Sequence, residues 1–234
     1  MKNINQSKEA TVTKVFNDVS NKYDLMNDIM SFGAHRVWKN KLIDWMNPGK
    51  NDHVIDIASG TGDIAKAFLR RTNFTGIVKC VEPNKNMLGI GKKKLEKFKN
   101  VEWFCSSAEK LPFKDETFDI YVVSFGIRNF SNINIALKES KRVLKTGGRF
   151  LCLEFSKVNN EVLSIIYERY SKLIPHLGKY IVGKSEPYDY LIKSINDFYN
   201  QDQLLNLIKS TGFENTEYRD LSGGIAAIHS GWKI

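Results

Sequence analysis

The sequence has few of the features that mark an exported, disulfide-bonded or membrane-spanning protein. Among its 234 residues there are only three cysteines, and no apolar run approaches the ~18 residues that cross a bilayer. Residues 1–9 have no apolar core, so we expect no export signal. Cys80, Cys105 and Cys152 lie far apart, each within an apolar run. This predicts buried, reduced thiols in strands, without disulfide or zinc spacing, in a cytoplasmic protein.

Basic residues outnumber acidic ones, and the formal net charge is +9. We interpret the densest basic cluster first as a solvated helix face. The alternative is peripheral contact with the inner membrane surface, where each basic residue near an anionic leaflet contributes about 1 kcal/mol. Nucleic acid is not expected as a partner, because neither a zinc pattern nor an RNA-binding aromatic motif accompanies the charge. The sequence does not indicate an oligomeric state. The densest basic cluster, interpreted above as a helix face, consists of Lys92, Lys93, Lys94, Lys97 and Lys99.

Apolar runs of strand length alternate with segments of helical periodicity, in a chain of the composition and length of one α/β domain. This alternation predicts βαβ units in a mostly parallel sheet, with ligands bound beyond the carboxyl ends of the strands. The expected strands are His53–Ala58, Ile77–Glu82, Val101–Cys105, Phe118–Ser124, Gly148–Phe155, Phe213–Arg219 and Ile225–His229. The expected helices are Asp63–Arg71, Asn86–Phe98 and Asn132–Leu144.

The most informative segment runs from Val54 to Asp63, where an apolar run ends in glycines and then opens into a helical pattern. Gly60 and Gly62 allow a tight turn and a close approach of a ligand to the backbone. Glu82 ends the next apolar run about 20 residues later, at the spacing of a nucleotide site whose acidic residue binds ribose hydroxyls.

Two carboxylates at this loop indicate which nucleotide it binds. Asp56 lies within the first strand and Asp63 directly follows the second glycine. They should repel a pyrophosphate, which favours the positive end of a helix, and should suit a ligand with cationic groups. S-adenosylmethionine has a sulfonium, an ammonium and an adenosine, so we favour a methyltransferase. An NAD-dependent oxidoreductase shares the loop and Glu82 and is the main alternative. A glycine turn without a ligand and a non-catalytic nucleotide-binding protein are the others.

Several blocks resemble those of the UbiE-type C-methyltransferases of quinone biosynthesis, and the resemblance runs from about Val15 to the C-terminus. It implies a class I S-adenosylmethionine-dependent methyltransferase: a Rossmann-like α/β fold with a seven-stranded, mostly parallel sheet and helices on both faces. It also implies C-methylation of a polyprenylated quinol, namely 2-methoxy-6-polyprenyl-1,4-benzoquinol and/or demethylmenaquinol. The blocks are residues 23–38, 124–129 and 142–156, with Gly212-Phe213 and residues 229–233 near the end.

We expect one domain over residues 1–234, with two parts outside the alternating core. Residues 10–46 should form an N-terminal helical cap, and residues 157–200 an inserted helical lid. An apolar stripe between Leu163 and Leu177 predicts a core-facing helix or a roof over a greasy substrate, ended or kinked by Pro175.

The candidate site residues follow from the loop and the resemblance. Asp56, Gly60, Thr61, Gly62 and Asp63 should bind the methionine end of the cofactor, and Glu82 its ribose. Ser107 and Ala108 should bind the adenine, and the resemblance adds Ser124. The family commonly has Asp where this chain has Glu82, and Asn or Asp where it has Ser107.

The catalytic candidates are Arg128, Asn129 and Tyr23. Arg128 should stabilise a quinol phenolate because arginine stays protonated, or else form a structural ion pair with a surface carboxylate. Asn129 could orient the hydroxyl, and Tyr23 could close over the methyl group or simply pack. Their presence argues against a protein that has lost its chemistry. No group of residues suggests a metal site.

Overall fold

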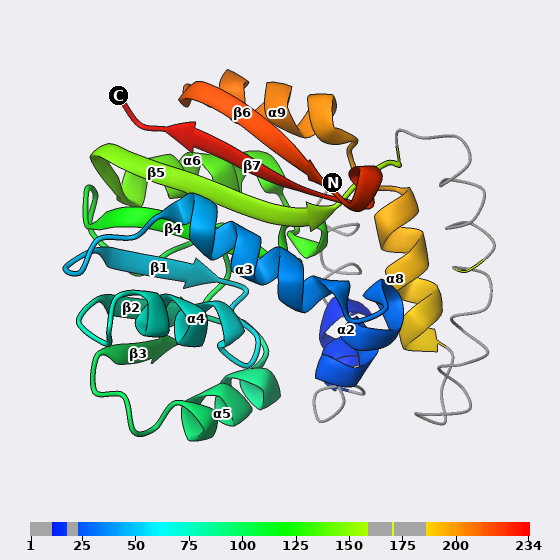
Figure 1. The fold of residues 1–234 in the computed structure, drawn as a ribbon, viewed down its shortest axis with the longest axis horizontal. Coiled ribbons are helices and arrows are strands. Elements are labelled where there is room, and N and C mark those ends of the chain that lie inside the picture. Colours follow the sequence, from blue (N-terminus) through cyan, green and yellow to red (C-terminus); the bar gives the residue numbers. More distant parts are fainter. Residues whose placement is uncertain (1–10, 18–22, 159–169, 171–185) are drawn as a thin grey trace.

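The computed structural model describes residues 11–17, 23–158, 170 and 186–234. Within them a seven-stranded sheet has the order β3-β2-β1-β4-β5-β7-β6 (Figure 1). Strands β1 to β5 pair in parallel, and β7 is antiparallel to both β5 and β6. This confirms the predicted fold class. The strands are β1 (His53–Ile57), β2 (Ile77–Val81), β3 (Val101–Phe104), β4 (Phe118–Ser124), β5 (Leu144–Phe155), β6 (Glu214–Leu221) and β7 (Ala226–Trp232).

Helices cover both faces of the sheet, which explains why its central strands are continuous apolar runs. Helices α3 (Ala34–Met46) and α4 (Asp63–Arg71) pack on one face. Helices α6 (Ile133–Val143) and α9 (Gln201–Ser210) pack on the other. Because side chains alternate along a strand, Val54 faces α3 and α4 while Ile55 faces the opposite core. Asp56 therefore lies on the α3 and α4 side.

The remaining described elements lie mainly around the carboxyl ends of the parallel strands, at the right of Figure 1. Residues 11–17 are helical and precede α2 (Tyr23–Ser31). Helix α8 (Glu186–Asn196) places Tyr188, Leu191 and Ile195 in the same core as α3. Helix α5 (Lys85–Lys94) follows β2, and the short helix η2 (Ile127–Asn129) follows β4. The short helix η3 (Ser222–Gly224) joins β6 to β7.

The predicted strands and helices are found close to their expected bounds, with some corrections. The helix expected over 86–98 ends at Lys94, and β5 begins at Leu144 instead of Gly148. Cys80 and Cys152 are buried as predicted, but Cys105 is exposed because β3 ends at Phe104, one residue earlier. The stripe from Leu163 to Leu177 lies outside the described residues except for Tyr170.

The described parts of residues 10–46 are mostly helical. The Tyr170 ring stacks on Phe32 with their centroids 3.8 Å apart, and its hydroxyl donates to the Ile29 carbonyl. His35 is buried against Asp28, with 2.9 Å between Nε2 and Oδ1, and burial lowers its pKa. Among the described residues, no helix combines the length and apolar character that a bilayer span requires.

Candidate active site

Two neighbouring cavities lie at the carboxyl ends of β1, β2 and β4. From β1 the chain first adds β2 and β3 on one side of the sheet, and then adds β4 and β5 on the other side of β1. This switch point is the usual ligand site of such sheets. The larger cavity has a volume of about 290 Å³ and contains five predicted residues: Gly60, Glu82, Ser107, Ala108 and Asn129. The smaller one, about 20 Å³, contains Asp56, Gly60, Thr61, Asp63 and Ser124.

Glu82 connects the glycine loop to the start of the next helix. Its carboxylate accepts hydrogen bonds from the Gly60 and Asn84 backbone N–H groups, both at 2.9 Å. Burial raises its pKa to about 7, although these two bonds favour the charged form. Each oxygen can accept a further hydrogen bond, and Glu82 lines the larger cavity, as a ligand for two ribose hydroxyls requires. Glu82 therefore fits its predicted role despite its extra methylene group.

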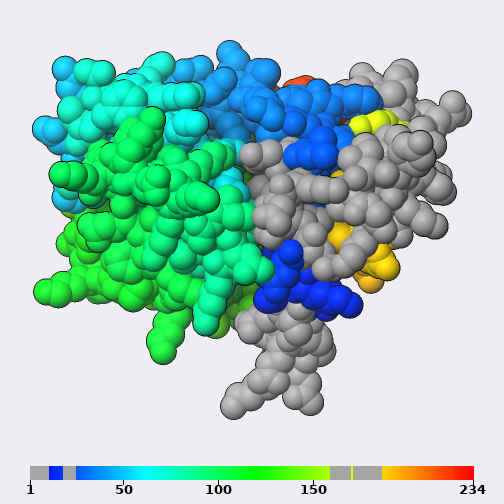
Figure 2. Space-filling model, turned by 90° about the horizontal axis from the view of Figure 1, so that it is seen from below, coloured from blue at the N-terminus to red at the C-terminus, as the bar shows by residue number. Residues whose placement is uncertain are grey.

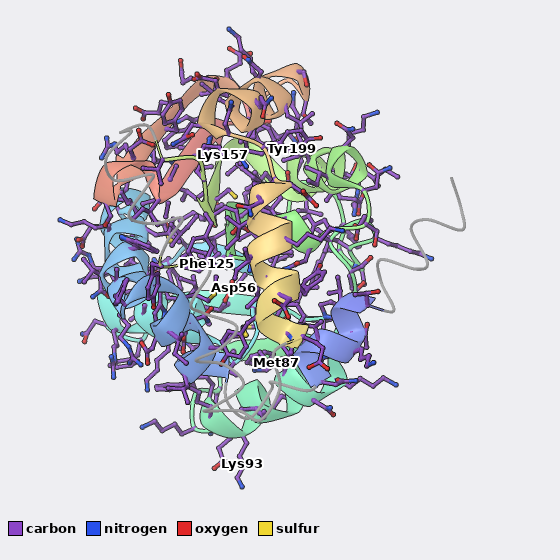
Figure 3. The ribbon with its side chains drawn as sticks, turned by 90° about the vertical axis from the view of Figure 1, so that its right-hand side faces the viewer. Asp56, Met87, Lys93, Phe125, Lys157 and Tyr199 are labelled. Carbon is purple, nitrogen blue, oxygen red and sulfur yellow. The ribbon has the colours of Figure 1, made fainter. Side chains whose placement is uncertain are left out.

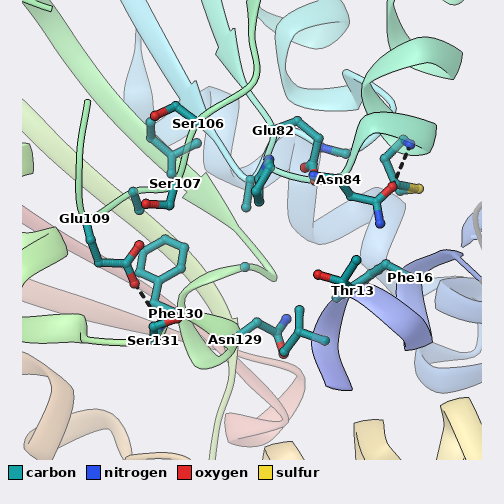
Figure 4. Close-up of a pocket in the computed structure, with 18 of the residues that line it drawn as sticks. Thr13, Phe16, Glu82, Asn84, Ser106, Ser107, Glu109, Asn129, Phe130 and Ser131 are labelled. Atoms are coloured by element: carbon teal, nitrogen blue, oxygen red, sulfur yellow. Dashed lines mark hydrogen bonds between the residues drawn. The ribbon is translucent and has the colours of Figure 1, made fainter. Parts of the chain in front are cut away.

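Polar and apolar groups enclose the rest of the larger cavity (Figure 4). In this view Ser107 lies on the left side of the cavity, and the Phe130 ring lies below Ser107. The Glu109 carboxylate accepts from the Ser131 backbone N–H at 2.7 Å, which joins the loops after β3 and η2. An apolar slot with hydroxyls at its edge suits an adenine ring.

Residues 11–17, which belong to the segment predicted as an N-terminal helical cap, cover part of this cavity. Val12, Thr13 and Phe16 contribute to its wall. Asn17 accepts from the Asn84 side chain at 2.8 Å, which ties this helix to the start of α5. In Figure 2 the dark blue atoms of residues 11–17 lie beside the green atoms of the loops that they cover.

The smaller cavity is bounded by buried polar atoms that have no hydrogen-bond partner among the described residues. Asp56 is 0% exposed, and neither of its carboxylate oxygens has a hydrogen-bond partner among the described residues; the Ser124 hydroxyl is likewise unpaired. Burial raises the pKa of Asp56 to about 8. Figure 3 places Asp56 near the centre of the molecule, seen from the side to which the strands point. Unpaired buried polar groups are costly, so this arrangement fits the polar methionine end of S-adenosylmethionine.

Asp63 is charged but locally neutralised. Its carboxylate binds the Lys39 ammonium at 2.8 Å and the Lys94 ammonium at 2.7 Å. Burial raises the Asp63 pKa, but the two lysines outweigh burial and hold it well below its usual value. The charge of Asp63 is therefore balanced within the protein, which weakens its expected contribution to the repulsion of a pyrophosphate. Lys94 also donates to Thr61 at 3.2 Å, so this residue of the basic cluster is paired beside the glycine loop without lining either cavity, whereas Lys92 and Lys93 are exposed.

The two glycines of the loop have different roles. Gly60 lies between the cavities, and its N–H binds Glu82. Gly62 lines neither cavity. It has a φ of +83°, and an added Cβ would lie 2.7 Å from Leu95 Cδ1. Gly62 is thus needed for the turn into α4 and for packing, and its predicted contact with the cofactor stays a prediction.

The predicted catalytic residues are only partly brought to the cavity. Asn129 reaches it, and its Oδ1 accepts from the Tyr190 hydroxyl at 3.0 Å. Arg128 is 5% exposed and does not line the cavity. Its Nη1 binds Glu154 at 2.6 Å and the Phe125 carbonyl at 2.8 Å. Arg128 therefore forms an ion pair with a buried carboxylate, and not with the surface carboxylate that the alternative expected. Tyr23 begins α2, and its side chain lies outside the described part.

The fold and the two cavities are those expected of an S-adenosylmethionine-dependent methyltransferase. Solved structures share this fold. A SAM-dependent methyltransferase of Thermotoga maritima has a TM-score of 0.68 at 22% identity, covering 94% of this chain and 99% of that one. Another, from Aquifex aeolicus, has a TM-score of 0.63 at 17% identity, covering 84% and 89%. At these identities the similarity shows the fold alone.

The chain belongs to the ubiE/COQ5 methyltransferase family, whose model matches residues 4–233. Two relatives bear the name ubiquinone/menaquinone biosynthesis C-methyltransferase UbiE. The one from Ruegeria is 46% identical over 231 residues, covering 97% of this chain and 92% of its own length. The one from Rickettsia bellii is 47% identical over 234 residues, covering 97% and 94%. The predicted family and cofactor are confirmed, and the oxidoreductase alternative has no support.

Proposed function

We propose that this enzyme methylates a ring carbon of a polyprenylated quinol, either 2-methoxy-6-polyprenyl-1,4-benzoquinol, demethylmenaquinol or both. The names of the relatives place them in ubiquinone and menaquinone biosynthesis, and the chain matches them along 97% of its length. The observation that carries the proposal is the position of Asn129. It lines the same cavity as Glu82, so one space holds the predicted ribose ligand and a polar group for the substrate.

The residues of the chain divide the work of binding and alignment. Glu82 holds the ribose, while Asp56 and Ser124 receive the polar end of the cofactor. Bound S-adenosylmethionine supplies a methyl group on a cationic sulfur. Asn129, held by the Tyr190 hydroxyl, orients the quinol hydroxyl beside the carbon to be methylated. Correct alignment of two reactants can supply ~7–11 kcal/mol of the barrier.

Arg128 supports this arrangement from behind the cavity. Its backbone precedes Asn129, and its side chain connects η2 to β5 through Glu154 and to α8 through the Ser194 hydroxyl at 3.3 Å. Direct stabilisation of the phenolate by Arg128 stays a prediction. So do closure of Tyr23 over the methyl group, the lid over 157–200, and membrane contact through the exposed lysines.

The test is transfer of a radiolabelled methyl group to short-tailed forms of both quinols. We expect a product methylated on carbon with at least one of them, and no dependence on NAD. Asn129→Ala should lower turnover without weakening cofactor binding, because Asn129 is assigned to the quinol. Asn17→Ala is a matched control, since it also removes an amide near the cavity but lies on the adenosine side. Absence of methyl transfer to both quinols by a protein that binds the cofactor would refute the proposed substrate class.

A further inference from the structure

Lys39 occupies an unusual position on α3, because it lies on the side of the helix that packs on the sheet. His35, Leu42 and Met46 are buried on this side and are related to Lys39 by helical spacing. The Lys39 side chain is 12% exposed. A lysine in such a stripe gives up most of its hydration, so its ammonium needs partners at the place that it reaches.

The ammonium of Lys39 reaches the smaller cavity. One partner is the Asp63 carboxylate, 2.8 Å from Nζ. The cavity is also bounded by the unpaired Asp56 carboxyl and the unpaired Ser124 hydroxyl. An ammonium has three N–H donors, so Lys39 can bind a second anion without releasing Asp63.

The methionine end of S-adenosylmethionine has two charged groups, an ammonium and a carboxylate. Asp56 and Ser124 provide acceptors for the ammonium. Among the described residues that bound the smaller cavity, Lys39 is the cationic side chain. Lys39 and Lys94 together have one positive charge more than Asp63 alone can balance. The surplus positive charge lies beside the cavity that we assign to the methionine end of the cofactor.

We propose that Lys39 binds the carboxylate of the methionine moiety of S-adenosylmethionine, so that the N-terminal segment of the chain supplies part of the cofactor site. The observation that carries this proposal is a largely buried ammonium beside unpaired Asp56 and Ser124 in one cavity. It rests on cofactor binding and is independent of the quinol proposed above.

The simpler explanation is that Lys39 only neutralises Asp63. Lys94 separates the two explanations, because it binds the same carboxylate at 2.7 Å but does not line the smaller cavity. If neutralisation is all that matters, removing either ammonium should have the same effect. If Lys39 binds the carboxylate of the cofactor, only its removal should abolish recognition of that group.

The experiment is calorimetric titration with S-adenosylmethionine and with its decarboxylated analogue, which has the same sulfonium and adenosine. The native protein should bind S-adenosylmethionine about 10- to 100-fold more tightly than the analogue, the size of one charged hydrogen bond. In Lys39→Met the preference should fall to within about threefold, mainly through weaker binding of S-adenosylmethionine. Lys94→Met should keep the full preference.

Three results would overturn the proposal: equal affinity of the native protein for both ligands, a full preference in Lys39→Met, or the same loss of preference in Lys94→Met. Circular dichroism checks that each variant is folded. If Lys39→Met does not fold, Lys39→Arg decides the question, because it keeps the charge and should keep at least a tenfold preference. Loss of that preference in a folded arginine variant would also refute it. No quinol enters these titrations, so a failure here is distinct from a failure of the proposed substrate.

Discussion

Replacing Arg128 tests whether its pairing with Glu154 holds the active site together. Both side chains are almost fully buried, at 3% and 1% exposure, and Nη1 lies 2.6 Å from Oε1. Arg128→Met keeps much of the side-chain volume but leaves Glu154 without its counter-charge. Breaking a buried pair in this way costs about 3–5 kcal/mol. In a protein of this size that corresponds to a fall in Tm of about 6–20 °C.

The matched control is Arg36→Met. Arg36 also binds a carboxylate, that of Asp28 at 2.7 Å, but its side chain is 64% exposed. An exposed pair contributes about 0–1 kcal/mol, so its loss should lower Tm by no more than about 4 °C. The two variants therefore break the same kind of pair at different burial, and thermal unfolding followed by circular dichroism compares them directly.

The effect of Arg128→Met should also depend on pH. Burial raises the pKa of Glu154, and Arg128 opposes that rise. Without Arg128 the folded-state pKa should rise further above that of the unfolded chain. The variant then loses stability as pH rises from the pKa of Glu154 in the unfolded chain towards its pKa in the folded protein. The fall in Tm caused by Arg128→Met should therefore be smaller at pH 5 than at pH 8. A Tm within about 2 °C of the native protein at pH 8, or a larger penalty at pH 5, would refute the structural role of the pair.

Turnover of a second set of variants addresses the other role predicted for Arg128. If the guanidinium contacts the quinol oxygen, Arg128→Ala should lower turnover by about 100-fold or more at saturating cofactor, and lysine should restore only part of it. Glu154→Gln keeps the guanidinium and should then retain most of the turnover while still losing stability. Near-normal turnover in a folded Arg128→Ala protein would leave Arg128 with its structural role alone.

Two further predictions concern the glycine loop. Burial raises the pKa of Glu82 to about 7, so S-adenosylmethionine should bind up to about tenfold more tightly at pH 7.5 than at pH 6, as the carboxylate that accepts from the ribose forms. Calorimetry should show that Glu82→Gln loses this gain; an unchanged profile would exclude Glu82 as its source. Gly62→Ala should cost at least about 2 kcal/mol in urea unfolding, since φ is +83° and the new Cβ would meet Leu95. Gly89→Ala, in α5 with open space around it, should instead be stabilising, and similar effects of the two changes would contradict this reasoning.

The sheet and the general position of the site could be predicted because their signals are local. Period-two and helical apolar patterns follow from the geometry of each element, and the glycines mark the turn between β1 and α4. Parallel strands bring their carboxyl ends together, so Asp56, Glu82 and Ser124 were expected near one another before any contact was known. The resemblance to a family then identified the cofactor, which the family comparison confirms.

Other features depended on distances between elements that no local pattern reports. Asp63 looked like a bare carboxylate, but packing of α3 and α5 beside the loop brings Lys39 and Lys94 to it from 24 and 31 residues away. One signal for Lys39 was present, namely a lysine on the apolar side of a helix. The sequence predicted residues 10–46 as a helical cap, but only the packing places residues 11–17 at the wall of the larger cavity.

The sequence by itself determined the order of the elements, the fold class and the kind of cofactor, because these depend on periodicity, glycine conformation and a specific family pattern. Only the tertiary structure decided the charge state and partners of the site residues. It pairs Arg128 with Glu154 and leaves Asp56 unpaired at a cavity. The physical reason is that desolvation and Coulomb interactions depend on burial and on separations of a few ångströms, which arise only when distant segments pack together.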